Sequence, residues 1–406
     1  MRLIKKFPYL GLIDGAGVRY PSPTNFNYFY SFGVFSITCL VIQIVTGIFL
    51  AMHYSPDVNF AFASVEHIMR DVNYGWLVRY VHANGASMFF VAVYVHMFRG
   101  FYYSSFTRPR HWLWVSGVVI LFLMIATAFL GYVLPWGQMS FWAATVITNL
   151  VSAIPKVGDS IVIWLWGGYS IGNATLTRFF TLHFTLPFVI LAIAIVHILL
   201  LHEFGSNNPL GVDFYPDSAM LTPYYTIKDW LSIVYFFMFF AIFVYFAPNL
   251  LGHPDNYIPA NPLVTPTHIV PEWYFLPFYA ILRSIPDKLG GVVALLGAIA
   301  ALALVPLLLE STIRSLKFRP LSRPLFYTFV VVCFILGWIG AMPIEPPYYQ
   351  IGQIATLAYF FYFFMLYPSV IFLEKLFNSA FFRHEHVSTE EFEDSDDEEE
   401  DPKNIS

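Results

Sequence analysis

Eight long stretches without a single Asp, Glu, Lys or Arg divide this 406-residue chain. A helix that crosses the hydrocarbon core of a bilayer needs about 20 mostly apolar residues, and each stretch supplies roughly that number or more. The third stretch is too long for one helix, but Pro135-Trp136-Gly137 ends the helix near Leu134. We therefore predict an all-α integral membrane protein with eight transmembrane helices, at about 31–53, 76–103, 112–134, 175–203, 229–247, 289–309, 324–342 and 349–373.

The composition excludes a soluble enzyme. Charged residues make up 12% of the chain, whereas soluble domains carry about 25%. The two cysteines, Cys39 and Cys333, both lie in apolar runs. They indicate neither a disulfide framework nor a zinc site, and no motif for covalent haem attachment is present.

Loop charges give the orientation. Of the 21 Lys and Arg residues, 15 lie on the same side of the membrane as the two termini. The positive-inside rule therefore places both termini on the cytoplasmic or matrix side, which is the negative side.

The end of the chain is strongly acidic. From His384 onward it holds 11 acidic residues and one lysine, and we predict that the acidic tail 381–406 is disordered.

Four histidines stand in the middle of two predicted spans: His82 and His96 on the second, His183 and His197 on the fourth. The members of each pair are 14 residues apart, so they share a helix face and lie about 21 Å apart along the axis. Both spans run in the same direction, which sets each histidine level with a histidine of the other span. Neutral imidazoles from two facing helices are suitable axial ligands for haem iron. A single such histidine more often bonds a neighbouring helix, but matched pairs predict two non-covalent bis-histidine b-type haems.

Four glycines repeat the same spacing. Gly33 and Gly47 lie on the first span, and Gly117 and Gly131 lie on the third. A helix that passes close to a porphyrin face needs positions without a side chain. The antiparallel direction of these spans places Gly47 and Gly131 near the positive-side haem, and Gly33 and Gly117 near the other.

Two arginines accompany the histidines of the second span. Arg79 lies three residues before His82, and Arg99 lies three residues after His96. We predict that they bind the anionic haem propionates. The alternative is that they anchor the helix at the membrane surface, and this is weaker for Arg79 because it lies on the side that basic residues avoid.

With these residues in place, the chain from about 20 to 375 resembles cytochrome b of the respiratory cytochrome bc complex (complex III, ubiquinol–cytochrome c oxidoreductase). The resemblance also rests on GYVLPWGQMSFW (131–142), LHEFGSNNPLG (201–211), YYTIKDW (224–230) and PEWY (271–274). It implies a negative-side segment 1–30, a dihaem four-helix bundle 31–215 and a C-terminal membrane domain 216–380. It further implies that His82 and His183 hold the low-potential haem iron, and that His96 and His197 hold the high-potential one.

The same resemblance implies a Q cycle. Ubiquinol is oxidised near the positive side, between the Pro-Trp-Gly and PEWY segments, and ubiquinone is reduced near the negative side, with proton translocation. The implied partners are a Rieske iron–sulfur protein, a membrane-bound c-type cytochrome subunit, a second copy of the complex in a homodimer, and membrane lipid, but no nucleic acid. The chain length and the acidic tail favour a bacterial inner membrane over a mitochondrial inner membrane.

Candidate residues for quinol oxidation lie in the positive-side segments. Glu272 is the only acid between Asp255 and Asp287, and a carboxylate in an apolar pocket can accept a quinol proton. Its alternative role is a capping carboxylate at a helix end. Tyr132 and Tyr279 are candidates to hydrogen-bond the quinol.

The negative-side candidates are His202, Ser206, Lys228 and Asp229, which match the quinone-reduction site that the resemblance implies. Without the resemblance, Lys228 and Asp229 would be interpreted as interface anchors.

Two positions depart from the family pattern. Ser31 stands where the family often has asparagine, so it is left out of the predicted ligands. Ala143 stands where glycine is common, which predicts resistance to methoxyacrylate-type inhibitors of quinol oxidation.

Two other functions fit part of the pattern. A dihaem b-type membrane anchor of another quinone oxidoreductase would share the histidines but would not require the PEWY segment or the last four spans. An eight-span transporter would need charged residues at the centres of its spans, and the sequence has none there.

Overall fold

The computed structural model describes residues 8–212 and 215–377. In this part of the chain, eight helices are long and apolar enough to cross a membrane. They are α3 (Phe32–Ala51), α5 (Gly75–Tyr102), α6 (His111–Val133), α9 (Asn173–Phe204), α10 (Thr226–Ala241), α12 (Lys288–Leu308), α13 (Ser322–Gly340) and α14 (Tyr348–Phe361). With the helical turns that adjoin them, the fifth and eighth spans cover Leu221–Phe246 and Tyr348–Phe377. The predicted number of spans is confirmed.

The fifth span begins earlier than predicted. The sequence set its start at Asp229, directly after Lys228, whereas the helical span begins at Leu221. The two charged residues therefore belong to the first turns of the span. Both side chains have partners within the protein, Asp229 in the Ser31 hydroxyl and Lys228 in the Phe26 carbonyl oxygen, which explains why a helix can carry them.

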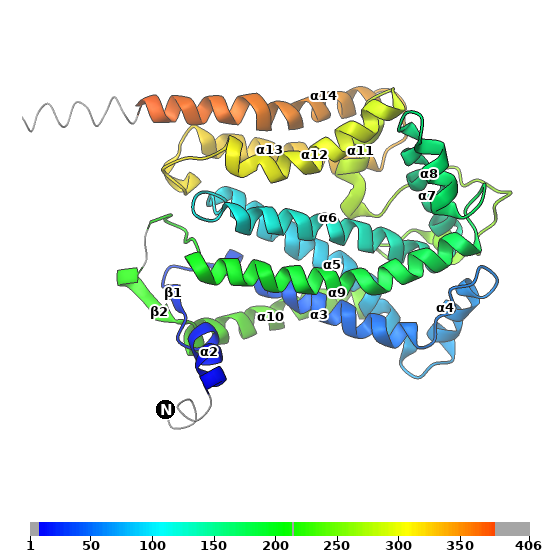
Figure 1. Ribbon diagram of the computed structural model, residues 1–406, viewed down its shortest axis with the longest axis horizontal. Coiled ribbons are helices and arrows are strands. Elements are labelled where there is room, and N and C mark those ends of the chain that lie inside the picture. Colours follow the sequence, from blue (N-terminus) through cyan, green and yellow to red (C-terminus); the bar gives the residue numbers. More distant parts are fainter. Residues whose placement is uncertain (1–7, 213–214, 378–406) are drawn as a thin grey trace, which may run out of the picture.

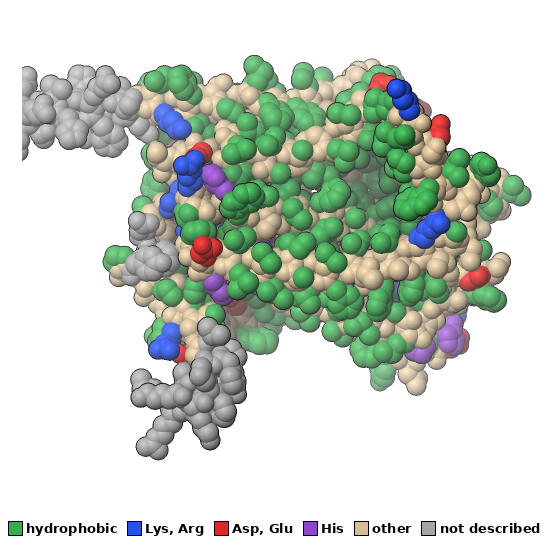
Figure 2. Space-filling view, viewed as in Figure 1, with side chains coloured by type: hydrophobic (Ala, Val, Ile, Leu, Met, Phe, Trp, Pro, Cys, Tyr) green, Lys and Arg blue, Asp and Glu red, His purple; other side chains and the backbone are tan. Residues whose placement is uncertain are grey.

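All eight spanning helices run roughly along one direction, which we take as the membrane normal (Figure 1). Helix α2 (Pro8–Gly17) and the described end of the eighth span lie at the same end of the bundle, as an even number of crossings requires. Hydrophobic side chains cover the middle of the face seen in Figure 2, and the charged side chains lie towards its two ends. This is the surface expected of a protein that a bilayer surrounds.

Short helices cover the end of the bundle that the loop charges predict to lie on the positive side of the membrane (Figure 1). They are α4 (Ala61–Arg70), α7 (Gln138–Asn149), α8 (Gly158–Trp166) and α11 (Leu276–Ser284). A 3₁₀ turn, Trp273–Phe275, leads into α11. Helix α11 thus closely follows the PEWY segment (271–274). Between α6 and α7, Trp136 has a positive φ of 55°, and this left-handed turn separates the two helices.

A small sheet at the negative-side end was not predicted. Strand β1 (Pro21–Pro23) pairs antiparallel with β2 (Ser218–Met220), so that Ser22 lies opposite Ala219. The Tyr225 hydroxyl also donates a hydrogen bond to the Pro23 carbonyl. The segment before the first span is thereby joined to the start of the fifth. The predicted acidic tail 381–406 lies outside the described residues.

One hydrophobic cluster runs through both predicted membrane domains. It contains buried residues of the first four spans, such as Phe35 and Ile190, together with Phe240, Val305 and Tyr359 from the last four. Helix α12 also packs against α6, and α13 packs against α5. The bundle 31–215 and the C-terminal domain 216–380 thus pack against each other, while the boundary between them stays a prediction.

Candidate functional site

The four mid-membrane histidines face one another in the two pairs that their spacing predicts. The ring centroids of His82 and His183 are 6.2 Å apart, and those of His96 and His197 are 6.4 Å apart. A metal–nitrogen bond is about 2 Å long, so two imidazoles on opposite sides of one iron place their centroids roughly 6 Å apart. Each pair therefore has the separation that a bis-histidine haem requires. Elsewhere in the described residues, no group of three or more His, Cys, Asp or Glu forms a metal site.

The Nδ1 nitrogen of each histidine ring also has a partner. Nδ1 of His183 lies 2.8 Å from the Thr127 carbonyl oxygen. A carbonyl can only accept, so this nitrogen carries the hydrogen and the Nε2 lone pair is left to bind a metal. A hydroxyl oxygen lies 2.9 Å from Nδ1 of His82, and another lies 2.8 Å from Nδ1 of His197.

His96 differs from the other three. Nη2 of Arg99 lies 2.9 Å from its Nδ1, and a guanidinium can only donate, so Nδ1 is the acceptor here. Iron on Nε2 of a neutral imidazole requires the hydrogen on Nδ1, and two donors cannot pair. Haem binding at His96 therefore requires Arg99 to leave this contact, which frees its guanidinium for an anionic group. The Arg99 guanidinium also stacks on the Tyr30 ring at 4.6 Å.

Each of the four repeated glycines lies against one of the four histidines. A Cβ atom added to Gly47 or Gly117 would come within 3.2 Å of Cε1 of His82 or His197, respectively. At Gly33 the corresponding distance to Cε1 of His96 is 3.4 Å, and at Gly131 a Cβ would overlap the His183 ring. The missing side chains thus let the imidazoles lie against α3 and α6.

These distances predict a graded series of alanine variants. Gly131→Ala is expected to lose most of the haem at the His82–His183 pair, because the methyl group takes space that the His183 ring occupies. Gly47→Ala and Gly117→Ala should reduce haem content less, and Gly33→Ala should retain nearly all of it, because its Cβ would make close to an ordinary contact. Reduced-minus-oxidised spectra of the purified variants measure the content. Equal losses at all four positions would contradict this order.

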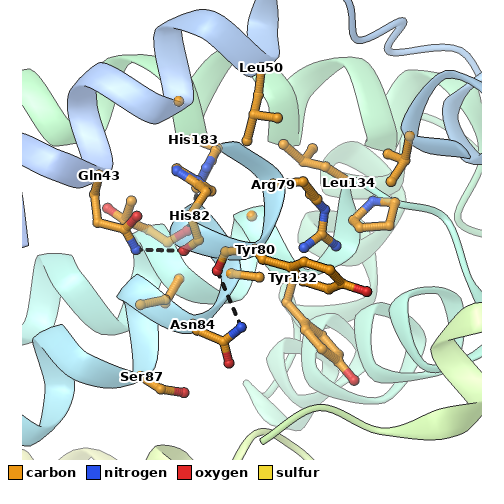
Figure 3. Close-up of a pocket in the computed structure, with 18 of the residues that line it drawn as sticks. Gln43, Leu50, Arg79, Tyr80, His82, Asn84, Ser87, Tyr132, Leu134 and His183 are labelled. Atoms are coloured by element: carbon orange, nitrogen blue, oxygen red, sulfur yellow. Dashed lines mark hydrogen bonds between the residues drawn. The ribbon is translucent and has the colours of Figure 1, made fainter. Parts of the chain in front are cut away.

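A cavity of about 530 Å³ opens beside the His82–His183 pair at the positive side. Both histidines line it, together with Arg79, Tyr132 and Glu272. Figure 3 shows His82 and His183 close together, with Arg79 and Tyr132 beside them in the same pocket. The cavity therefore brings together residues of both motifs that the sequence assigned to quinol oxidation and both ligands predicted for one haem.

The Glu272 side chain is not tied to the helical turn that follows it. It occupies the position before the 3₁₀ turn Trp273–Phe275, but its side chain makes no capping hydrogen bond. No capping hydrogen bond therefore supports the alternative interpretation of this residue. Burial raises the pKa of its carboxyl from 4.5 to about 7, although the positive charge of Arg79 opposes that shift. A carboxyl with this pKa exchanges protons readily near neutral pH.

The two tyrosines predicted beside Glu272 have different surroundings. The Tyr132 hydroxyl is buried without a hydrogen-bond partner and lines the cavity. Tyr279 is not among the residues that line the cavity, and its ring lies beneath the Arg283 guanidinium at 5.1 Å.

Ala143 is buried on α7 and does not line the cavity, so no contact supports the expected inhibitor resistance.

The negative-side candidates gather where the segment before α3 meets α9 and α10. The Ser31 hydroxyl donates a hydrogen bond of 2.9 Å to Asp229 Oδ1, so the residue that the sequence excluded belongs to this cluster. Lys228 Nζ donates to the Phe26 carbonyl oxygen at 2.5 Å. The ring of His202 lies 4.5 Å from that of Tyr20, and Ser206 is half-buried just beyond the end of α9.

Comparison with known protein families identifies the family of the chain. The family model described as cytochrome b/b6/petB matches residues 18–205, and the model described as cytochrome b (C-terminal)/b6/petD matches residues 259–360. The chain belongs to the cytochrome b family. As a member of this family, it is the cytochrome b of respiratory complex III, a haem-binding subunit that carries electrons across a membrane.

Relatives match over nearly their whole length. Cytochrome b of Chondrus crispus is 62% identical over 375 residues, which are 92% of this chain and 98% of that protein. Cytochrome b of Cyanidium caldarium is 59% identical over 355 residues, 87% of this chain and 92% of the relative. A chain of a hyperthermophilic respiratory complex III has a TM-score of 0.87 at 34% identity, covering 92% of this chain and 99% of that one.

Proposed function

We propose that this cytochrome b oxidises quinol in the positive-side cavity and reduces quinone at the negative-side cluster. The observation that carries the proposal is that the cavity is lined by one histidine pair and also by Glu272 and Tyr132. Two b-type haems, one at each histidine pair, would supply the one-electron relay between the two surfaces. Ubiquinol and ubiquinone are the substrates implied by the family resemblance.

Glu272 is the proposed acceptor of a quinol proton. Oxidation of a quinol to a quinone releases two electrons and two protons, and a proton released inside an apolar cavity needs a base there. The deprotonated Glu272 carboxylate can take that proton, and the pKa of about 7 lets the carboxyl release it again to water on the positive side. Arg79, which lines the same cavity, favours the charged carboxylate form.

Tyr132 is the proposed hydrogen-bond partner of the quinol. Its hydroxyl is buried and has no partner within the chain, and a buried polar group of this kind costs about 1–3 kcal/mol unless something satisfies it. A quinol oxygen in the cavity would satisfy it. Tyr279 stays a weaker candidate, because its ring lies under Arg283 and not on the cavity wall.

Quinone reduction is proposed for the cluster of His202, Ser206, Lys228 and Asp229, to which we add Ser31. Reduction of a quinone takes up two protons, and His202 and Asp229 are the groups here that can supply them. The hydrogen bond from Ser31 fixes the orientation of the Asp229 carboxyl. The contacts of Lys228 with the Phe26 carbonyl and, at 4.8 Å, with the Tyr28 ring hold its ammonium group beside the same cluster.

A Rieske iron–sulfur protein and a membrane-bound c-type cytochrome are the proposed electron-transfer partners, in a homodimeric complex surrounded by lipid. The match to a respiratory complex III supports an assembly of several subunits. The relatives are organellar cytochromes b, so the bacterial inner membrane stays a prediction, with the mitochondrial inner membrane beside it. In both, the termini face the negative side.

Spectroscopy and activity of the purified complex test the proposal together. We expect two b-type components in the reduced-minus-oxidised spectrum and quinol-dependent reduction of cytochrome c. A single b-type component would contradict the two-haem arrangement. Two components without cytochrome c reduction would favour the dihaem anchor of another quinone oxidoreductase.

A further inference from the structure

Two hydroxyl residues stand in the same relation to two of the histidines. Thr46 precedes Gly47 on α3, and Ser116 precedes Gly117 on α6. Thr46 Oγ1 lies 2.9 Å from Nδ1 of His82, and Ser116 Oγ lies 2.8 Å from Nδ1 of His197. In both places the glycine lets the imidazole approach the helix, and the residue before it presents an oxygen to the ring.

The direction of these hydrogen bonds follows from the single hydrogen of each hydroxyl. The Thr46 hydroxyl donates to the Ile42 carbonyl oxygen at 2.6 Å, within its own helix. The Ser116 hydroxyl donates to the Leu113 carbonyl oxygen at 2.8 Å. Since each hydrogen is engaged there, the oxygen faces the histidine with a lone pair and accepts from Nδ1–H.

We propose that Thr46 and Ser116 are positioning residues for two of the iron ligands, one at each haem. Each hydroxyl holds its histidine in the tautomer with the hydrogen on Nδ1, so that the Nε2 lone pair points towards the paired histidine. This inference rests on the proposed function, because it requires a haem at each pair. Thr46 acts on the positive-side haem through His82, and Ser116 acts on the negative-side haem through His197.

An acceptor on Nδ1–H also makes the imidazole a stronger electron donor to the metal. A stronger donor stabilises ferric iron more than ferrous iron, because the ferric ion carries the greater positive charge. Removal of one hydroxyl therefore favours the ferrous state of that haem. Changes in such supporting groups alter metal affinity by roughly 10- to 100-fold. A tenfold change in the ferric-to-ferrous preference raises the midpoint potential by about 59 mV for one electron.

Redox titration of the two b-type bands in the purified complex tests the proposal. Thr46→Val replaces the hydroxyl with a methyl group of similar size and is expected to raise the potential of one haem by about 59 mV. Ser116→Ala should raise that of the other haem alone. Each variant is thus the internal control for the other. Thr46→Ser, which keeps the hydroxyl, should restore the wild-type potential.

A matched control separates this role from a general effect of losing a hydroxyl in a spanning helix. Thr38 lies on α3 and donates to the Val34 carbonyl oxygen at 2.8 Å, as Thr46 does to Ile42, but among the described residues no hydrogen bond joins it to a histidine ring. Thr38→Val should leave both potentials unchanged. If Thr46→Val loses its haem, the proposal requires Thr46→Ser and Thr38→Val to retain it.

Three outcomes overturn the proposal: unchanged potentials in both variants, equal shifts of both haems in one variant, or the same effect in Thr38→Val. Failure of the proposed function is distinguishable from these outcomes. In that case the wild-type complex itself would lack two b-type components, before any variant is compared.

Discussion

Replacing His183 with leucine is expected to leave a complex that holds only one of the two proposed b-type haems and has lost quinol–cytochrome c activity by at least about a thousandfold. Leucine cannot bind iron, and the paired His82 alone would supply only one of the two nitrogen ligands. The Thr127 carbonyl, which accepts from His183 in the native protein, would also lose its ring partner. Difference spectroscopy measures the haem content, and reduction of cytochrome c measures the activity.

The pairing itself can be tested by comparing four variants. His82→Leu and His183→Leu should retain the same haem, with the same spectrum and midpoint potential, and His96→Leu and His197→Leu should both retain the other. His67, an exposed residue whose Nδ1 lies 2.9 Å from Asp71 Oδ2, is the control. Its change to glutamine should leave both haems in place. If the two variants of one histidine pair retained different haems, the predicted pairing would be wrong.

Replacing Glu272 with glutamine is expected to slow quinol oxidation by about 100-fold or more, the usual contribution of a positioned general base. Glutamine keeps the size and the hydrogen-bonding capacity of the side chain but cannot accept a proton. The pKa of about 7 also sets a pH dependence. The carboxylate is the active form, so activity is retained above pH 7 and falls about tenfold per unit below it.

Initial rates measured from pH 5.5 to 8.5 would reveal this fall in activity below pH 7, which should be absent in the Glu272→Gln variant. Glu345 is an exposed carboxylate between α13 and α14 on the same side of the membrane. The Glu345→Gln variant should keep the wild-type rate of quinol oxidation and the same fall in activity below pH 7. If the activity of Glu272→Gln still fell below pH 7 as in the wild type, the titration would belong to another group, and Glu272 would have no part in the proposed proton transfer.

Sequence reasoning predicted the parts of this protein that a single helix and a bilayer determine. The number of spans follows from apolar length, because a backbone in hydrocarbon must satisfy its hydrogen bonds within a helix. The pairing of His82 with His183 and the placement of Gly47 follow from the 14-residue spacing, because a regular helix converts spacing into a face and a height. The start of the fifth span was placed too late because the charged pair Lys228 and Asp229 was taken to mark its boundary.

The tertiary structure decided which distant side chains meet. The bond from Ser31 to Asp229, the contacts of Thr46 and Ser116 with histidine rings, and the position of Tyr279 away from the cavity have no signal in the local pattern. Each depends on how one helix is rotated and shifted against another, which is set by the packing of many side chains together. The sequence by itself thus determined the crossings and the level of each proposed haem ligand. The packing of the helices determined what holds those ligands in place and which carboxyl lies beside them in the cavity.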